Sequence, residues 1–252
     1  MSDWNPTRYL QFEAERTRPA NELAARVDFS QATAITDLGC GPGNSTAVLV
    51  KLAPRAAITG VDNSAAMLEK ARNILPGCHF QTADIEQWQA DSRQDVIFAN
   101  ASLQWVANHQ VVFPRLVSQL AIEGQLAVQM PDNWHEPSHR LMREVAVEMG
   151  YPDRNRESIL RADEYYDILT EAGCELDLWR TTYFHIMPST ESIIDWLSTT
   201  GLRRFLNHLP PAQQEKYLQR YRELIAENYP VQQDGKVIMP FPRLFILARR
   251  IR

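Results

Sequence analysis

The amino-acid sequence predicts an α/β protein built around a mostly parallel sheet of seven strands. Short apolar runs alternate with segments of helical periodicity through residues 34–130, and this alternation is typical of βαβ units. The predicted strand at 95–99 carries Val-Ile-Phe in succession, as parallel strands buried on both faces do. A glycine-rich turn at 39–43 follows the first apolar run and precedes a helix, so strand, turn and helix come in succession.

Apolar runs bounded by turn residues mark the individual strands. We expect strands over 34–36, 56–61, 78–82, 95–99, 125–130, 175–186 and 244–248. Apolar residues at helical spacing predict the helices, with Ser64 as an N-cap and Gly173 just beyond a helix end. We expect helices over 22–27, 45–52, 65–75, 139–149, 162–172, 192–199 and 211–229, and one that reaches 120 and is distorted near Pro114.

Two insertions interrupt this alternation, at about 131–161 and about 188–235. With an N-terminal segment, 1–30, they predict a single domain over 1–252 whose helical segments cover the carboxyl edge of the sheet. In the N-terminal segment, Arg18-Pro19 should interrupt any helix, because a residue before proline avoids the α region. This segment either acts as a lid or packs on the core as an ordinary helix.

Composition argues against several classes of partner, although a local basic patch stays compatible with it. The net charge of −5 argues against a nucleic-acid partner, whose binding surfaces are usually basic. No apolar run approaches about 18 residues, so we expect no membrane span. The N-terminus carries no secretory signal pattern, and the three cysteines form no C-x-x-C pair, which argues against a metal site or disulfide framework. We therefore expect a cytoplasmic protein without metal. Its oligomeric state stays open, and a monomer is compatible with the sequence.

The turn that begins at Asp37 has the composition of a nucleotide-type site. Glycines allow positive φ and let a ligand approach the backbone. Gly39 and Gly41 fit a dinucleotide fingerprint, but Asn44 stands where the third glycine belongs, and no Gly-Lys-Ser/Thr sequence follows. Asp37 would repel a pyrophosphate and suits a cation. Cys40 within the turn is read as a packing residue. The alternative is a βα turn that binds nothing.

Acidic and amide residues follow the next strands of the predicted sheet. Asp62 ends the second strand, where an acid can accept hydrogen bonds from ribose hydroxyls, although aspartate also caps helices. Asp84 and Ile85 follow the third strand, and Asn100 ends the fourth. For Asp84 the alternative is an acid in a surface turn. Because the carboxyl ends of parallel strands share one edge, these residues are candidates for one site.

The Asp-x-Gly-x-Gly-x-Gly pattern at 37–43 resembles motif I of the class I S-adenosylmethionine (SAM) methyltransferases. The resemblance implies a Rossmann-like seven-stranded fold and SAM as cofactor, with S-adenosylhomocysteine as product. It also implies that Asp62 holds the ribose hydroxyls, that Asp84 and the Ile85 N–H meet the adenine, and that Asn100 meets the methionine portion. The full set of implied cofactor residues is Asp37, Gly39, Cys40, Gly41, Gly43, Asp62, Asn63, Asp84, Ile85 and Asn100.

The sequence offers no dedicated catalytic base. After the fourth strand it reads Asn-Ala-Ser-Leu-Gln-Trp rather than the Asn-Pro-Pro-Tyr type of amino-methylating motif. This suits a nucleophile that is already ionised, such as a carboxylate with a pKa near 4. Transfer from a sulfonium to a carboxylate neutralises both charges, so a dry site favours it. We assign no catalytic residue and expect the protein to act by proximity and orientation.

Further segments resemble the bacterial trans-aconitate methyltransferases across nearly the whole chain. These segments are 4–6, 15–20, 98–105, 129–134, 165–169 and 179–183. The resemblance implies methyl esterification of trans-aconitate, a small-molecule tricarboxylate, in the cytoplasm. The alternatives are an O-methyltransferase acting on another small acid or on malonyl-acyl carrier protein, and a SAM-binding regulator without catalysis.

A tricarboxylate requires cationic partners, and arginine holds a carboxylate through a bidentate fork. We favour Arg18 and Arg180, with Tyr9, Gln104 and Trp105 as walls of the site. Any one of these arginines is alternatively a solvated surface residue. His109 could donate to a carboxylate, but we read it as a helix-start or surface histidine. The other candidate arginines are Arg16, Arg154, Arg156, Arg203 and Arg204.

Overall fold

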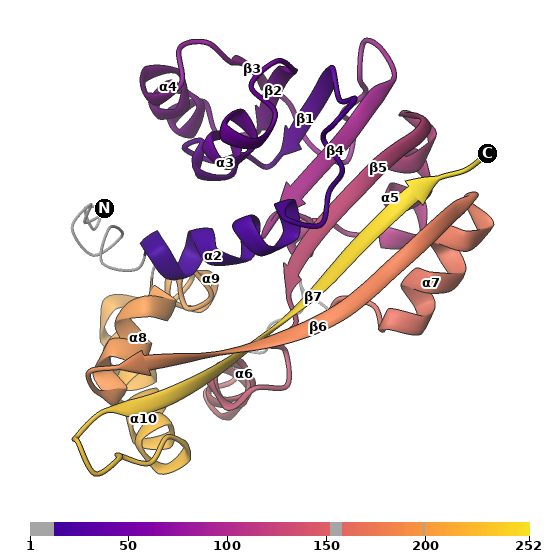
Figure 1. Cartoon of the computed structure of the whole chain (residues 1–252). Coiled ribbons are helices and arrows are strands. Elements are labelled where there is room, and N and C mark those ends of the chain that lie inside the picture. Colours follow the sequence, from indigo (N-terminus) through magenta and orange to yellow (C-terminus); the bar gives the residue numbers. More distant parts are fainter. Residues whose placement is uncertain (1–12, 152–157, 199) are drawn as a thin grey trace. The chain divides into compact units, whose positions relative to one another are not determined.

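The computed structural model describes residues 13–151, 158–198 and 200–252. This part of the chain contains a seven-stranded sheet with the strand order β3-β2-β1-β4-β5-β7-β6 (Figure 1). The strands are β1 (Ala34–Leu38), β2 (Ala57–Asp62), β3 (His79–Thr82), β4 (Gln94–Asn100), β5 (Leu120–Pro131), β6 (Cys174–Met187) and β7 (Val237–Arg250).

The first five strands are parallel, which confirms the predicted fold class. β1 pairs with both β2 and β4, β2 also pairs with β3, and β4 with β5. In this register Asp37 lies beside Phe98 of β4, and Asp62 lies beside Thr82 of β3. The carboxyl ends of β1 to β4 therefore share one edge of the sheet, as the prediction of a common site requires.

β6 and β7 run in opposite directions at the far end of the strand order (Figure 1). β7 is much longer than the predicted strand at 244–248, because it continues through Pro240 and Pro242. Prolines lack a backbone donor and argue against a strand in a sequence-based assignment. The prediction therefore began the strand only after them.

The contacts within the chain divide the protein into two compact units. The sheet unit comprises Glu13–Pro131, Ile159–Thr181 and Leu244–Arg252. The insertion unit includes the described residues of Asp132–Ser158 and Thr182–Arg243. Both predicted insertions fall largely in the insertion unit, which also takes in one end of β6 and one end of β7. The single domain and the covering role of the insertions stay predictions.

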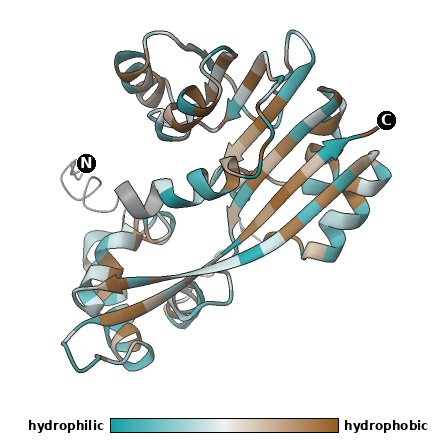
Figure 2. Cartoon of the chain, viewed as in Figure 1, coloured by the Kyte–Doolittle hydropathy of each residue, from teal (hydrophilic) through white to brown (hydrophobic). Residues whose placement is uncertain are grey.

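The core of the sheet unit lies between the strands and their helices. Its helices are α2 (Glu13–Ala24), α3 (Asn44–Leu52), α4 (Ala65–Ile74), the 3₁₀ turn η1 (Leu103–Trp105), α5 (His109–Ser118) and α7 (Ala162–Glu171). Figure 2 shows long hydrophobic stretches along the central strands. Ile97 and Ala99 of β4 and Leu126 and Val128 of β5 are fully buried. Burial of these apolar side chains is the main favourable contribution to folding.

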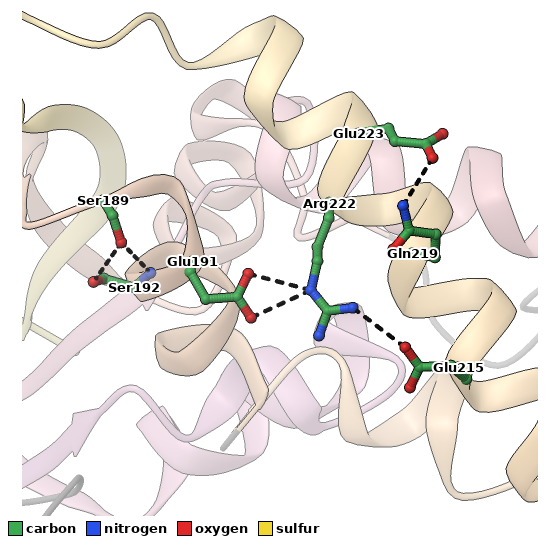
Figure 3. A network of polar contacts seen from close by, with 7 residues as sticks. All are labelled: Ser189, Glu191, Ser192, Glu215, Gln219, Arg222 and Glu223. Atoms are coloured by element: carbon green, nitrogen blue, oxygen red, sulfur yellow. Dashed lines mark hydrogen bonds and ion pairs between the residues drawn. The ribbon is translucent and has the colours of Figure 1, made fainter.

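The helices of the insertion unit are α6 (Pro137–Glu148), α8 (Thr190–Ser198), α9 (Arg203–Leu206) and α10 (Pro211–Asn228). The sequence did not predict α9, which has a single turn and no buried residue. α8 and α10 are joined by Arg222, whose Nε donates to both carboxylate oxygens of Glu191, at 3.3 and 3.2 Å (Figure 3). Arg222 also pairs with Glu215 of its own helix at 3.6 Å (Figure 3). Such solvated pairs contribute about 0–1 kcal/mol each, so buried residues such as Trp196 and Tyr221 carry the packing.

The predicted helix break at Arg18-Pro19 is wrong. α2 runs from Glu13 to Ala24 with Pro19 inside it. A proline within a helix costs about 3 kcal/mol, and here tertiary packing offsets that cost. Ala20, Leu23 and Ala24 are buried, and α2 packs against α3 and β5. The described part of the N-terminal segment therefore packs on the core as a helix.

β5 begins before the predicted strand at 125–130 and contains an irregularity near Glu123. Glu123 has a φ of 67°, and the register of β4 with β5 shifts between Gln94 and Val96. The helix before this strand ends at Ser118 rather than at 120, with Pro114 inside it. No helix among the described residues is both long enough and apolar enough to cross a membrane.

Candidate cofactor site at the carboxyl ends of the strands

The glycine turn is held against the end of β2. The Gly39 and Cys40 N–H groups both donate to the Val61 carbonyl, at 2.7 and 3.0 Å. Gly39, Gly41 and Gly43 have φ values of 73°, 54° and 96°, in the left-handed region that favours glycine. Gly43 is the N-cap of α3. A residue with a side chain would be strained at each of these three φ values, so glycines form the turn from β1 into α3.

Gly39 leaves no room for a side chain. A Cβ at this position would lie 2.2 Å from the Cβ of Ser102 and 3.4 Å from the Cδ1 of Ile85. Ser102 is fixed there because its hydroxyl donates to the Leu38 carbonyl at 2.7 Å. The glycine turn therefore contacts both the loop after β3 and the loop after β4. At Gly41, by contrast, an added Cβ would meet nothing within 4 Å.

Asp37 is a fully buried carboxylate at the end of β1. Its Oδ2 accepts hydrogen bonds from the hydroxyls of Ser45 and Thr46, both at 2.7 Å. No donor among the described residues reaches its Oδ1, which is also buried. Ser45 and Thr46 thus lie inside α3 and orient Asp37. A buried acceptor without a partner is costly, so this atom indicates a ligand that donates.

The environment of Asp37 favours its neutral form. Burial raises the pKa of Asp37 to about 6, while the hydroxyls of Thr46 and Ser45 lower it and the charge of Asp62 raises it. Between about pH 4 and 6 the ligand-free folded state keeps this proton, whereas the unfolded chain has released it. This group therefore lowers the free energy of unfolding as the pH rises through that window. A cation bound beside Asp37 would reverse this effect by favouring the carboxylate.

We expect the affinity for a cationic ligand at this turn to depend on pH. Below about pH 6, binding must expel one proton from Asp37, so affinity should rise about tenfold per pH unit and level off above pH 6. Titration calorimetry with SAM from pH 5 to 8 measures this dependence. In an Asp37→Asn variant the slope should flatten, because the residue no longer titrates. If affinity depends on pH equally steeply in both proteins, Asp37 is not the group that titrates.

Asp62 is held in one orientation at the end of β2. Its Oδ2 accepts from the Gly41 N–H at 3.0 Å and its Oδ1 from the Ser64 N–H at 2.8 Å. Each carboxylate oxygen keeps a further lone pair for another donor. Ser64 begins α4 as expected, since its hydroxyl accepts from the Met67 N–H at 3.4 Å. Asn63 lies exposed between the two.

Cys40 is a packing residue. Its side chain is 3% exposed and forms a cluster with Leu68, Ala71 and Phe80. Burial raises the pKa of the Cys40 thiol far above its usual range, and the charges of Asp37 and Asp62 raise it further. The thiol therefore stays protonated and is not a nucleophile.

The loop after β3 forms a tight turn around Asp84. The exposed Asp84 carboxylate accepts from the Glu86 N–H at 2.8 Å, and its carbonyl accepts from the N–H of Trp88 at 2.8 Å. The exposed carboxylate fits both a surface-turn acid and a ligand contact. Ile85 is half-buried and lies next to Gly39, so the loop does reach the glycine turn.

The end of β4 and the loop after it carry two further buried acceptors. Neither Asn100 Oδ1 nor Gln104 Oε1 has a hydrogen-bond donor among the described residues. The Gln104 Nε2 donates to the Ala101 carbonyl at 2.7 Å, which fixes the amide with its oxygen pointing away. Ala101 has a φ of 54°, and its N–H donates to the Gln129 carbonyl at 2.9 Å. Non-glycine residues with positive φ cluster at functional sites, so this strained residue agrees with a ligand site here.

These atoms fit the donor groups of an adenosyl cofactor. Asp37, Asn100 and Gln104 offer buried oxygens, and Asp62 offers oriented ones. SAM carries an ammonium and two ribose hydroxyls, all of them hydrogen-bond donors. A pyrophosphate or a tricarboxylate has only acceptors at neutral pH and would be repelled.

The described residues predicted to bind substrate lie on three separate elements, α2, η1 and β6. Arg18 lies on α2 with 64% of its side chain exposed and pairs with Glu22 at 2.8 Å. Arg180 is exposed on β6, which β5 and β7 separate from β4 in the strand order. Gln104 and Trp105 do lie together on η1, directly after Ser102, which packs against Gly39. Tyr9, Arg154 and Arg156 lie outside the described residues.

His109 is a core residue rather than a surface one. It begins α5 as expected, but only 7% of it is exposed. Its Nδ1 shares a hydrogen bond with the Tyr165 hydroxyl at 2.5 Å, and its Nε2 lies 2.9 Å from the Leu103 carbonyl. Burial lowers the pKa of His109, while the backbone contacts oppose this shift. Both ring nitrogens are thus engaged within the protein.

Sequence-based reasoning missed three residues that shape this site. Ser45 and Thr46 orient Asp37, and Ser102 packs against Gly39. The two hydroxyls could have been found from their spacing, since residues eight and nine after the acid lie in the first turn of α3. No comparable signal marks Ser102. Within the described residues, no cluster of His, Cys, Asp and Glu could hold a metal ion.

Comparisons with known proteins agree with this geometry. A family model described as a methyltransferase domain matches residues 29–173. A trans-aconitate 2-methyltransferase from Escherichia coli O157:H7 is 58% identical over 250 residues, 99% of either chain. A protein of the same name from Shigella flexneri is 57% identical over the same share. An O-methyltransferase from a trans-AT polyketide synthase of Brevibacillus brevis, solved with S-adenosyl-L-homocysteine, superposes with a TM-score of 0.57 at 19% identity. That alignment covers 98% of this chain and 77% of the other.

Proposed function

We propose that this chain, which belongs to the methyltransferase-domain family and within it to the trans-aconitate 2-methyltransferases, transfers a methyl group from SAM to trans-aconitate. The reaction esterifies one carboxylate and gives the monomethyl ester and S-adenosylhomocysteine. The observation that carries this proposal is 58% identity across 99% of the chain to a protein of that name. The buried, unpartnered oxygen of Asp37 supports the cofactor.

The cofactor contacts follow from the donors and acceptors at the strand ends. Asp62, held by Gly41 and Ser64, accepts from the ribose hydroxyls, and Asp84 with the Ile85 N–H recognises the adenine. Asp37 faces the positively charged methionine portion together with Asn100. When bound, SAM supplies an electrophilic methyl group on its sulfonium.

Gln104 fits the cofactor better than the substrate. Its amide is fixed by the bond to the Ala101 carbonyl, so the unpartnered atom is the Oε1 acceptor. A tricarboxylate at neutral pH offers only acceptors, and two acceptors facing each other repel. We therefore assign Gln104 to a donor group of the cofactor and keep Trp105, 55% exposed, as a wall for the substrate.

The chain supplies orientation rather than a base. His109 is engaged at both nitrogens, and the Cys40 thiol stays protonated. The substrate carboxylate is already ionised and needs no base. Holding the reactants in line is worth several kcal/mol of the barrier. The free cysteines Cys40, Cys78 and Cys174 agree with a cytoplasmic protein.

A panel of acids tests the proposal. Purified protein is given SAM with trans-aconitate, cis-aconitate, citrate, or malonyl-acyl carrier protein, and S-adenosylhomocysteine release is measured. We expect turnover with trans-aconitate well above that with the others. SAM binding without turnover on any acid would instead support a regulator, and preference for the carrier protein would shift the substrate assignment.

The same assay separates substrate residues from cofactor residues. Arg18→Ala and Arg180→Ala should raise the KM for trans-aconitate about tenfold or more and leave the KM for SAM unchanged, because each removes a carboxylate partner. Arg93→Ala, on the loop before β4, serves as a control. If both KM values rise together, these arginines do not hold the substrate.

A further inference from the structure

We infer that Arg115 of α5 is a positioning residue that holds the loop after β3 in the conformation that recognises adenine. The inference rests on the proposed function, because it assigns that loop to the cofactor. Arg115 lies outside every motif that the sequence suggested.

Arg115 reaches two carbonyls of the loop with one guanidinium group. Its Nη2 donates to the Ile85 carbonyl at 2.6 Å, and its Nη1 donates to the Trp88 carbonyl. The two acceptors are three residues apart at either end of the turn that Asp84 begins. A charged, planar fork holds both with a fixed spacing, which a lysine cannot do.

Gln119, at the C-terminal end of α5, contacts the same loop. Its Oε1 accepts from the Ala90 N–H, and its Nε2 lies 3.4 Å from the Trp88 carbonyl. On the other side, Glu86 of the loop accepts from the Ala107 N–H at 3.1 Å. The loop after β3 is thus tied to α5 and to the segment that follows η1.

These contacts bear directly on the adenine-recognising groups. Trp88 is 3% exposed and buried in the main core, so its end of the loop is anchored by packing. Ile85 packs against the same core but is only half-buried, beside Gly39, so packing holds it less firmly than Trp88. The Arg115 bond to its carbonyl therefore restrains the orientation of the residue whose N–H, next to Asp84, meets the base. Without Arg115 the Ile85 carbonyl loses its bond to the guanidinium, and the turn keeps only its internal hydrogen bonds and its packing.

The test compares two bases in wild-type and variant proteins. Titration calorimetry measures binding of S-adenosylhomocysteine and of its hypoxanthine counterpart, which lacks the 6-amino group and carries a proton on N1. Wild-type protein should prefer adenine. In Arg115→Met the affinity for S-adenosylhomocysteine should fall about tenfold and the preference for adenine should shrink by a similar factor. The affinity and the adenine preference of Arg115→Lys should lie between those of wild type and Arg115→Met. The KM for trans-aconitate should be the same in all three proteins.

Ser118→Ala is the matched control, because Ser118 bonds to the Arg115 carbonyl on the same helix but does not contact the loop. It should keep the wild-type base preference. An equal loss for both bases in Arg115→Met and Arg115→Lys would overturn the inference and leave a purely structural role. If Arg115→Met fails to fold, Arg115→Lys alone decides. Wild-type protein that binds neither ligand would contradict the proposed function instead.

Discussion

Replacing Gly39 with alanine should destabilise the protein by about 2–5 kcal/mol and abolish SAM binding. The new Cβ would lie 2.2 Å from the Ser102 Cβ, a distance that forces the backbone to move. Overpacking costs about 1–3 kcal/mol, and a φ of 73° costs an alanine about 1–2 kcal/mol more. The shift displaces the glycine turn from Asp37 and Asp62. Urea denaturation and calorimetry with SAM measure the two effects.

A second glycine separates the steric cost from the conformational one. Gly235 has a φ of 82°, and an added Cβ there would meet nothing within 4 Å. Gly235→Ala should therefore cost only about 1–2 kcal/mol and leave SAM binding intact. If Gly39→Ala and Gly235→Ala lose a similar free energy of unfolding, the contact with Ser102 adds nothing to the cost at Gly39.

A double variant tests the contact itself. In Gly39→Ala/Ser102→Gly the clashing Cβ is absent, so part of the stability lost in Gly39→Ala should return despite the loss of the Ser102 bond to Leu38. Residues in contact show such non-additive effects. Strict additivity of the two single variants would contradict the close approach.

Asp62→Asn should weaken the binding of S-adenosylhomocysteine about a hundredfold. The carboxylate accepts from the Gly41 and Ser64 N–H groups through both oxygens, and an amide would turn its NH₂ towards one of them. Reorientation and the lost charge together remove about 3 kcal/mol of hydrogen bonding to the ribose. A 2′-deoxyribose analogue should bind the variant almost as well as the parent ligand, whereas wild-type protein should distinguish them.

Asp95 provides the matched control for Asp62. Its carboxylate also accepts from two backbone N–H groups, those of Thr33 and Ala34, but it lies at the opposite ends of the strands. Asp95→Asn should lower the thermal midpoint of unfolding about as much as Asp62→Asn does. It should leave the affinity for S-adenosylhomocysteine unchanged. Equal affinities for Asp62→Asn and wild type would remove Asp62 from the ribose site.

Local patterns predicted the sheet unit well and failed where packing decides. The glycine turn, the acids at the ends of β1 and β2 and the cap at Ser64 are local, because each depends on residues within one βα unit. Pro19 in α2 is different, since its helix persists only because Leu23 and its neighbours are buried against α3 and β5. The length of β7 likewise depends on neighbouring strands rather than on its own prolines.

The sequence alone determined the fold class, the glycine turn and the identity of the acids around it, because strand-turn-helix signals and residue chemistry are encoded locally. The tertiary structure decided how these groups are held. It buried Asp37 with one oxygen satisfied and one not, raised its pKa to about 6, placed Ser102 against Gly39 and joined Arg115 to the loop after β3. The approach of Ser102 to Gly39 and of Arg115 to the loop depends on contacts between residues far apart in the chain, and no local pattern records them.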